Sequence, residues 1–215
     1  MTVPAEEARR IVIDGYARAS REYRGDVFPL AGSRYAHWLA RFAAGLAPGA
    51  RVLDAGCGNG LPVAHELAKR FEVTGVDLSP VQVERARALV PGARFVCADM
   101  TGVEFPDASF DGVAAFYSVI NVPLAEQPAL LARFARWLVP GGRLVVTVGQ
   151  EPWSGIERHW RGVAGAEMFY EHAGIEQYRA WLAEAGFEIL EQGREPREGV
   201  PGYAMVIARR AGAEG

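Results

Sequence analysis

Three aspartates, Asp54, Asp77 and Asp99, each follow a short apolar stretch. If these stretches are strands of one parallel sheet, the three carboxylates meet at one edge, where ligands of such sheets bind. A carboxylate that ends the second strand can accept both hydroxyls of a ribose. Asp99 could accept from an exocyclic amine such as that of adenine, and Asp54 could attract a cationic ammonium group. A single strand-end aspartate could simply cap a helix, so the argument depends on the shared placement of all three.

A glycine-rich loop joins the first of these strands to a helical pattern, and it reads Asp54-Ala55-Gly56-Cys57-Gly58-Asn59-Gly60. Glycines allow sharp turns and let a ligand approach the backbone closely. The N-terminus of the helix behind the loop presents unpaired N–H groups to negative charge. This order of elements indicates a site for a charged, nucleoside-like ligand. A nicotinamide-dependent dehydrogenase would need Gly-x-Gly-x-x-Gly, and here the third glycine comes one position early, which disfavours that alternative.

The elements that must position these residues alternate between strands and helices. Apolar patterns and turn signals predict strands over 51–54, 71–77, 93–98, 110–116, 143–148, 187–191 and 203–208, and helices over 5–21, 34–46, 61–70, 81–90, 123–138 and 174–184. This rhythm favours right-handed βαβ units and a parallel sheet with helices on both faces. Residues 151–171 are rich in aromatic side chains but show no clean periodicity.

The composition is typical of a globular protein, since 50% of the 215 residues are apolar and 23% are charged. The formal net charge of −3 gives no basic footprint, which disfavours a nucleic-acid partner. No apolar run approaches the roughly 18 residues of a membrane span. The first residues lack the basic-then-apolar leader of secreted proteins, and the two cysteines, Cys57 and Cys97, offer no disulfide framework. We therefore expect a cytoplasmic protein without a membrane partner.

Taken in order, these motifs resemble the class I S-adenosylmethionine-dependent methyltransferases. The stretches that carry the resemblance are residues 52–60, 75–80, 97–100, 110–113 and 138–144. The resemblance implies an α/β fold: a doubly wound, mostly parallel seven-stranded sheet with helices on both faces, the last strand antiparallel, and an N-terminal helical cap. We expect a single domain over 1–215, with the cap over 1–47, a cofactor-binding core over 48–150 and an acceptor-side segment over 151–215.

The resemblance also implies roles toward S-adenosylmethionine and its product S-adenosylhomocysteine. The residues expected to bind the cofactor are Tyr16, Tyr23, Asp54, Gly56, Cys57, Gly58, Gly60, Asp77, Leu78, Asp99, Met100 and Phe116. In similar small enzymes N-terminal tyrosines close over the cofactor, and Tyr16 and Tyr23 match that role, with Arg24 as a companion. Asp77 would bind the ribose and Asp99 the adenine amine. We expect no metal ion.

The acceptor side must be inferred from residues outside the glycine core. Methyl transfer from a sulfonium depends on placing the acceptor in line and excluding water, and a hydroxyl acceptor usually needs a base as well. His172 is our candidate base, because residues 168–172 resemble an aromatic-plus-histidine segment of some relatives and histidine titrates near neutral pH. Tyr117 is the second catalytic candidate, as a hydrogen-bonding partner. Some relatives carry a histidine where this chain has Asn121, which cannot act as a base.

We therefore expect an enzyme that methylates a small, aromatic or otherwise apolar molecule, on oxygen rather than nitrogen, and that is a monomer or a homodimer. A peptide or protein methyltransferase is an alternative, and it would need an open groove near Trp153 and Trp160. A homologue that binds the cofactor without methyl transfer is another alternative. The sequence does not identify the acceptor.

Overall fold

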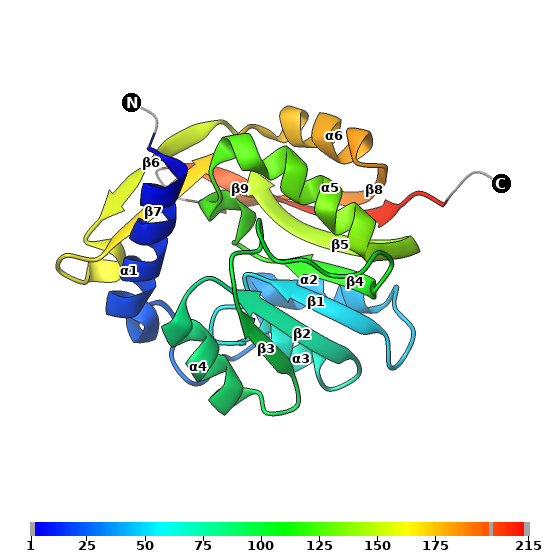
Figure 1. Ribbon diagram of the computed structural model, residues 1–215, viewed down its shortest axis with the longest axis horizontal. Coiled ribbons are helices and arrows are strands. Elements are labelled where there is room, and N and C mark those ends of the chain that lie inside the picture. The colour runs from blue at the N-terminus through cyan, green and yellow to red at the C-terminus, as the bar shows by residue number, and fades with distance from the viewer. Residues whose placement is uncertain (1–2, 198–199, 213–215) are drawn as a thin grey trace.

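A sheet of seven strands organises the fold (Figure 1). The computed structural model describes residues 3–197 and 200–212. The strands are β1 (Arg51–Ala55), β2 (Glu72–Asp77), β3 (Arg94–Cys97), β4 (Phe110–Ala115), β5 (Leu138–Gly149), β8 (Phe187–Arg197) and β9 (Val200–Arg210). Their order is β3-β2-β1-β4-β5-β9-β8, and β9 is antiparallel to both of its neighbours. The expected mostly parallel sheet with an antiparallel last strand is confirmed, and this strand lies between β5 and β8.

Helices cover both faces of the sheet, as the alternation of elements predicts. They are α1 (Ala5–Tyr23), α2 (Arg34–Ala43), α3 (Val63–Leu67), α4 (Pro80–Leu89), α5 (Gln127–Trp137) and α6 (Ile175–Glu184). On one face Phe134 of α5 and Tyr178 of α6 share a core with Leu53, and on the other Phe42 of α2 shares a core with Val52. These neighbours on β1 belong to different cores because successive side chains of a strand point to opposite faces. None of the helices within residues 3–197 and 200–212 combines the length and the apolar character that crossing a membrane requires.

A two-stranded ribbon lies beside α1, at the side of the main sheet (Figure 1). It pairs β6 (Trp153–Arg158) with β7 (Glu167–His172) in antiparallel register. We did not predict these strands from the sequence. The residues of β6 are mostly exposed and those of β7 almost all buried, so neither strand shows the alternation that marks a half-buried strand.

Helix α1 packs closely against the ribbon and forms the N-terminal cap. Its buried residues Ile11 and Val12 share a core with Met168 and Phe169 of β7. A Cβ atom at Gly15 would lie 2.2 Å from the carbonyl oxygen of Glu167. Only glycine permits this close approach, which sets the position of α1 over the edge of the sheet.

One local expectation at the glycine loop needs correction. Helix α3 is shorter than the predicted 61–70, because the chain turns after Leu67, whose carbonyl oxygen accepts from the N–H groups of both Arg70 and Phe71. Ser79 stands at the N-cap of α4, but its hydroxyl makes no capping bond. Asp77 Oδ1 accepts from the backbone N–H of Ser79 itself at 2.9 Å, just before the helix begins.

Candidate active site

The carboxylates of Asp54 and Asp77 lie at the ends of the adjacent parallel strands β1 and β2. Asp77 Oδ2 accepts from the N–H of Gly58 at 2.8 Å, and Oδ1 accepts from the N–H of Ser79. These two bonds attach the glycine loop and the start of α4 to the end of β2. Asp54 is only 1% exposed, and its Oδ2 atom has no hydrogen-bond partner.

Burial of these two groups shapes the electrostatics of the site. Burial and the neighbouring Asp77 raise the pKa of Asp54 to about 8, against an opposing hydrogen bond from the Ala64 backbone. Burial raises the pKa of Asp77 to about 6, while the N–H groups of Ser79 and Gly58 oppose the shift. A buried carboxylate without a partner is costly, so this edge of the sheet favours a ligand that brings a positive charge to Asp54.

The glycine loop leaves room for a ligand through its backbone conformation. Gly56 has a φ of +78°, and a Cβ there would lie 2.1 Å from the Cβ of Ser118. Ser118 is fixed in place, since its hydroxyl donates to the carbonyl oxygen of Ala55 at 2.7 Å. Glycine at position 56 is therefore required for both its conformation and its space.

Asp99, which follows the end of β3, is already engaged by α1. Its Oδ1 accepts from the N–H and the hydroxyl of Thr101, both at 2.8 Å, and its Oδ2 accepts from Arg9. Arg9 also donates to Thr101 and Glu126. Burial would raise the pKa of Asp99, but the hydrogen bonds from Arg9 and Thr101 outweigh it and lower the pKa. The N-terminal cap thus reaches the carboxylate expected to bind an adenine amine, a contact that we did not predict from the sequence.

The strand-end carboxylates share one cavity with the N-terminal cap. The expected residues that line it are Tyr16, Tyr23, Asp54, Gly56, Cys57, Gly58, Asp77, Leu78, Asp99, Met100, Phe116 and Tyr117. Gly60 is not among the lining residues, whereas Arg9, Tyr35 and Thr101 are, although no local motif marks them. The enclosed space is about 80 Å³. Ligand pockets span about 300–1,000 Å³, so a nucleoside-sized ligand requires residues that line this cavity to move apart.

Aromatic rings close the cavity on the side of the cap. Tyr23 stacks on Trp160 with ring centroids 5.1 Å apart, and Tyr16 meets the edges of both rings. Trp160 is 1% exposed, and its Nε1 donates to the Tyr170 hydroxyl at 2.9 Å. The ribbon therefore supports the two tyrosines expected to cover a cofactor.

Arg24 follows α1 at the boundary between this cavity and a second one. Its Nη2 donates to the Tyr35 hydroxyl at 2.8 Å, and the guanidinium lies over the rings of Tyr23 and Phe28. Its Nε and Nη1 atoms are buried without a hydrogen-bond partner. Arg24 can therefore hold an anionic group of a ligand in either cavity.

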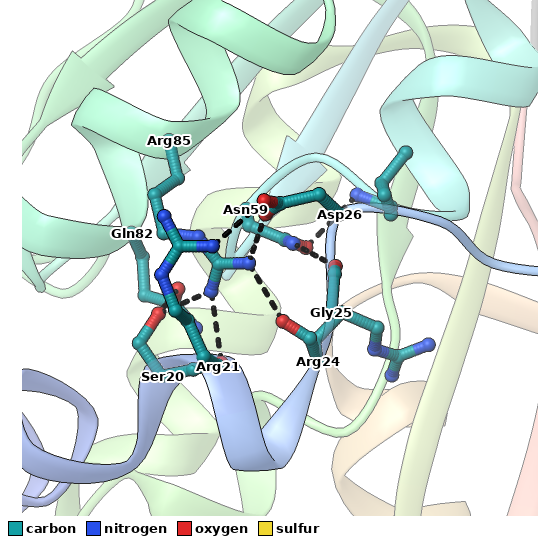
Figure 2. A network of polar contacts seen from close by, with 9 residues as sticks. Ser20, Arg21, Arg24, Gly25, Asp26, Asn59, Gln82 and Arg85 are labelled. Atoms are coloured by element: carbon teal, nitrogen blue, oxygen red, sulfur yellow. Dashed lines mark hydrogen bonds and ion pairs between the residues drawn. The ribbon is translucent and has the colours of Figure 1, made fainter.

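A polar network fixes the end of α1 to the core (Figure 2). Arg85 of α4 donates to the carbonyl and hydroxyl oxygens of Ser20, at 2.8 and 2.5 Å, and to Asp26 at 2.6 Å. Asn59 of the glycine loop donates from Nδ2 to the Gly25 carbonyl at 3.0 Å. These bonds attach the end of α1, the helix that carries Tyr16 and Tyr23, to α4 and to the glycine loop. We call these two residues the lid tyrosines.

The second cavity has a volume of about 910 Å³ and opens beside the first. Both cavities are lined by Tyr16, Tyr23, Arg24, Tyr35, Tyr117 and Asn121. Tyr117 has a φ of +52°, an unfavourable conformation for a tyrosine that is typical of functional sites. Asn121 donates to the Phe169 carbonyl at 2.6 Å, and this bond joins the wall shared by the two cavities to the ribbon.

His172 does not lie with the other candidates. It is 4% exposed, and it is not among the described residues that line either cavity. A Cβ at Gly149 would lie 2.0 Å from His172 Nδ1, so the imidazole fills the space that glycine leaves on β5. Burial lowers the pKa of His172, while the hydrogen bonds that its ring makes to the backbone of Ala173 and Glu151 oppose the shift.

Comparison with known proteins bears directly on these elements. Residues 52–142 match the family model described as the methyltransferase domain. The chain is 38% identical over 132 residues to a sterol 24-C-methyltransferase of Yarrowia lipolytica. This alignment covers 57% of this chain and 33% of that protein. It is 36% identical over 165 residues to the 27-O-demethylrifamycin SV methyltransferase of Amycolatopsis mediterranei, covering 67% of this chain and 57% of that protein. The chain thus spans between a third and somewhat over half of the length of these relatives.

A solved structure extends the likeness to nearly the whole chain. The 1,6-didemethyltoxoflavin-N1-methyltransferase of Burkholderia thailandensis, solved with 1,6-didemethyltoxoflavin and S-adenosylhomocysteine bound, is similar with a TM-score of 0.74. The similarity covers 98% of this chain and 92% of that one at 24% identity, so it concerns the fold. The matched domain contains all three strand-end aspartates and the glycine loop, so residues 52–142 of this chain form a methyltransferase domain.

Proposed function

We propose that this chain transfers the methyl group of S-adenosylmethionine to a small, aromatic or apolar molecule, with oxygen as the first candidate for the acceptor atom and nitrogen as the second. The observation that carries the proposal is the wall shared by the two cavities. Tyr35, Tyr117 and Asn121 line both the space at the strand-end aspartates and the larger space of about 910 Å³. A methyl donor on one side and an acceptor on the other would meet at this wall.

The residues of the first cavity fit the cofactor. The unpartnered Oδ2 of Asp54, with its raised pKa, suits the ammonium group of the methionine part. Asp77 would accept from the ribose hydroxyls and Asp99 from the adenine amine, and Gly56 lines the same cavity beside Asp54, where the methionine part would lie. When bound, the cofactor supplies an electrophilic methyl group on its sulfonium.

The lid supports a small acceptor over a peptide. A peptide would need an open groove at both Trp153 and Trp160; Trp153 is 37% exposed, but Trp160 is 1% exposed and stacks against Tyr23. The chain's own part in catalysis is then to align the acceptor and to exclude water, which together can supply much of the rate of an in-line displacement. Tyr117 is the side chain that we assign to contact the acceptor. We assign no proton transfer to His172, because it does not line the described wall of either cavity.

The proposal is tested first by calorimetric titration with S-adenosylhomocysteine, with NADH as the control ligand. We expect saturable binding of S-adenosylhomocysteine alone. Asp77→Asn should weaken that binding by about 1–3 kcal/mol, because a charge-assisted acceptor is lost, while Asp111→Asn, at the far end of the sheet, should leave it unchanged. Tight binding of NADH, or wild-type affinity in Asp77→Asn, would contradict the proposal.

Turnover is then measured as release of S-adenosylhomocysteine from S-adenosylmethionine with a panel of phenols and amines. We expect an acceptor-dependent rate that Tyr117→Phe lowers. Conversion of an acceptor without a gain of a methyl group, detected by mass spectrometry, would instead support a homologue that has lost methyl transfer.

A further inference from the structure

The second cavity is strongly basic although the chain as a whole is acidic. The arginine and histidine side chains among the described residues that line it are Arg24, Arg34, His37, Arg161 and Arg194, and no aspartate or glutamate is among those described residues. The formal net charge of the whole chain is −3. A cleft lined by one sign of charge, with apolar walls, concentrates ligands of the opposite sign.

Arg24 alone would not establish an acceptor site, because it also lines the first cavity and could hold the carboxylate of the cofactor. The charges that belong to the second cavity are Arg34, Arg161 and Arg194. They come from three separate elements, the start of α2, the loop of the ribbon and β8. The cofactor cavity is not lined by any of these three arginines, so their charge concerns the acceptor.

Arg161 is held in a costly conformation. Its φ is +59° and that of His159 is +50°, in the left-handed region that residues with side chains rarely adopt. The guanidinium of Arg161 lies 5.2 Å from the ring centroid of Tyr23 and 5.5 Å from that of Trp160. Strain of this kind persists where the surrounding structure fixes it and is common at ligand sites. The ribbon loop thus presents a cation beside the lid tyrosine.

No carboxylate of the described residues forms an ion pair with Arg161 or Arg194 within 4.0 Å. Arg34 places its guanidinium 5.4 Å from the ring centroid of Tyr117, the residue at the shared wall. Glu157 of β6 acts electrostatically on Tyr170, but it does not line the cavity. The described lining therefore offers cations at its edge and aromatic rings at its wall.

We propose that the acceptor of this enzyme is an aromatic acid, a molecule whose flat apolar body packs on the tyrosines of the second cavity and whose carboxylate or phosphate is bound by Arg161 and Arg194. The inference rests on the proposed function, since it names the substrate class of the same site. It adds a requirement that the fold does not impose, because a neutral acceptor would bring no negative charge to Arg161 and Arg194.

The binding test uses two fluorescent probes with the same rings, 8-anilinonaphthalene-1-sulfonate and the neutral N-phenyl-1-naphthylamine, in the presence of S-adenosylhomocysteine. We expect the anionic probe to bind more tightly and the double variant Arg161→Gln/Arg194→Gln to weaken it about five- to tenfold, the scale of two partly exposed charge pairs. The neutral probe should be unaffected. Arg158→Gln is the matched control, because Arg158 lies on the same ribbon, has a side chain that is 81% exposed and does not line the cavity.

Displacement of the anionic probe then identifies the anionic group. Cinnamate or phenyl phosphate should displace the anionic probe, whereas cinnamyl alcohol should not. The acid that displaces the probe at the lower concentration identifies the preferred group, carboxylate or phosphate. Equal displacement by cinnamyl alcohol, or an unchanged affinity in the double variant, would overturn the inference. Calorimetry with S-adenosylhomocysteine separates the two proposals. If the wild-type protein binds S-adenosylhomocysteine but shows no preference for anionic probes, the proposed function stands and this inference is overturned. If it does not bind S-adenosylhomocysteine, the proposed function itself is overturned.

Discussion

The buried carboxyl of Asp54 should make the protein without ligand less stable as the pH rises, and Asp54→Asn should remove this dependence. The ordinary pKa of the group is 3.8, and in the folded protein it is about 8. Between these values the folded protein holds a proton that the unfolded chain has lost. The free energy of unfolding therefore falls with rising pH across this window.

The magnitude follows from the shift at about 1.36 kcal/mol per pKa unit. Raising the pH from 3.8 to 7 costs about 4 kcal/mol of stability through Asp54. Asparagine keeps the shape and the acceptor for the Ala64 N–H but does not titrate. Asp54→Asn should thus be more stable than the wild type by about 2 kcal/mol at pH 5 and about 4 kcal/mol at pH 7, a difference in Tm of about 8–16 °C at the higher pH.

Thermal unfolding of both proteins at pH 5, 6, 7 and 8 measures this difference, and calorimetry measures their affinity for S-adenosylhomocysteine. The variant should be more stable and bind less tightly, because the group that destabilises the free protein is the one we assign to the ligand's ammonium. Asp111→Asn is the control of opposite sign: burial of Asp111 is outweighed by hydrogen bonds from Arg51, so its pKa is lowered and its loss should destabilise. A variant at position 54 no more stable than the wild type at pH 8, or a difference that does not widen with pH, would refute the reasoning.

Three further substitutions test the lid and the packing around it. Arg85→Gln removes four hydrogen bonds to the segment after Ser20 and should speed tryptic cleavage there, monitored by mass spectrometry; unchanged cleavage would argue against an anchor. Gly149→Ala places a Cβ 2.0 Å from His172 Nδ1 and should cost about 3 kcal/mol in chemical denaturation. His172→Asn should change kcat less than about tenfold, because general bases contribute about 100-fold or more; a larger loss with an altered pH–rate profile would give this histidine the proton transfer.

The sequence predicts the strand ends and the glycine loop well because their signals are local. Gly56 and Asp54 stand in one continuous loop, and the strand that ends at Asp77 follows the next helix. Each is recognisable from its neighbours along the chain, and parallel pairing then brings the strand ends together without further information.

The N-terminal cap and the acceptor side depend on contacts that no local pattern encodes. Arg9 meets Asp99 across 90 positions, and Arg85 meets Ser20 across 65. The candidate base His172 shows the same limit: an aromatic segment with a histidine suggests an acceptor site, but the glycine at position 149 allows the imidazole to pack against β5 instead. Which way a side chain points at the end of a strand depends on register, and register in the ribbon was not visible in the sequence.

The two attachments of α1 differ in a way that bears on how the lid opens. Arg9 and its partners Asp99 and Glu126 have side chains 26–31% exposed, whereas Arg85 at the other end is 11% exposed. Between them Ala19 departs from helical geometry, with φ −121° and ψ 20°. Partly exposed ion pairs are weak and buried hydrogen bonds to charged groups are stronger, so we expect α1 to open from its N-terminal end while residues 20–26 stay attached. Opening breaks the bond from Arg9 and frees the Asp99 oxygen, which would then accept from the adenine amine. The new bond replaces the lost one, so the free-energy cost of admitting the cofactor stays small.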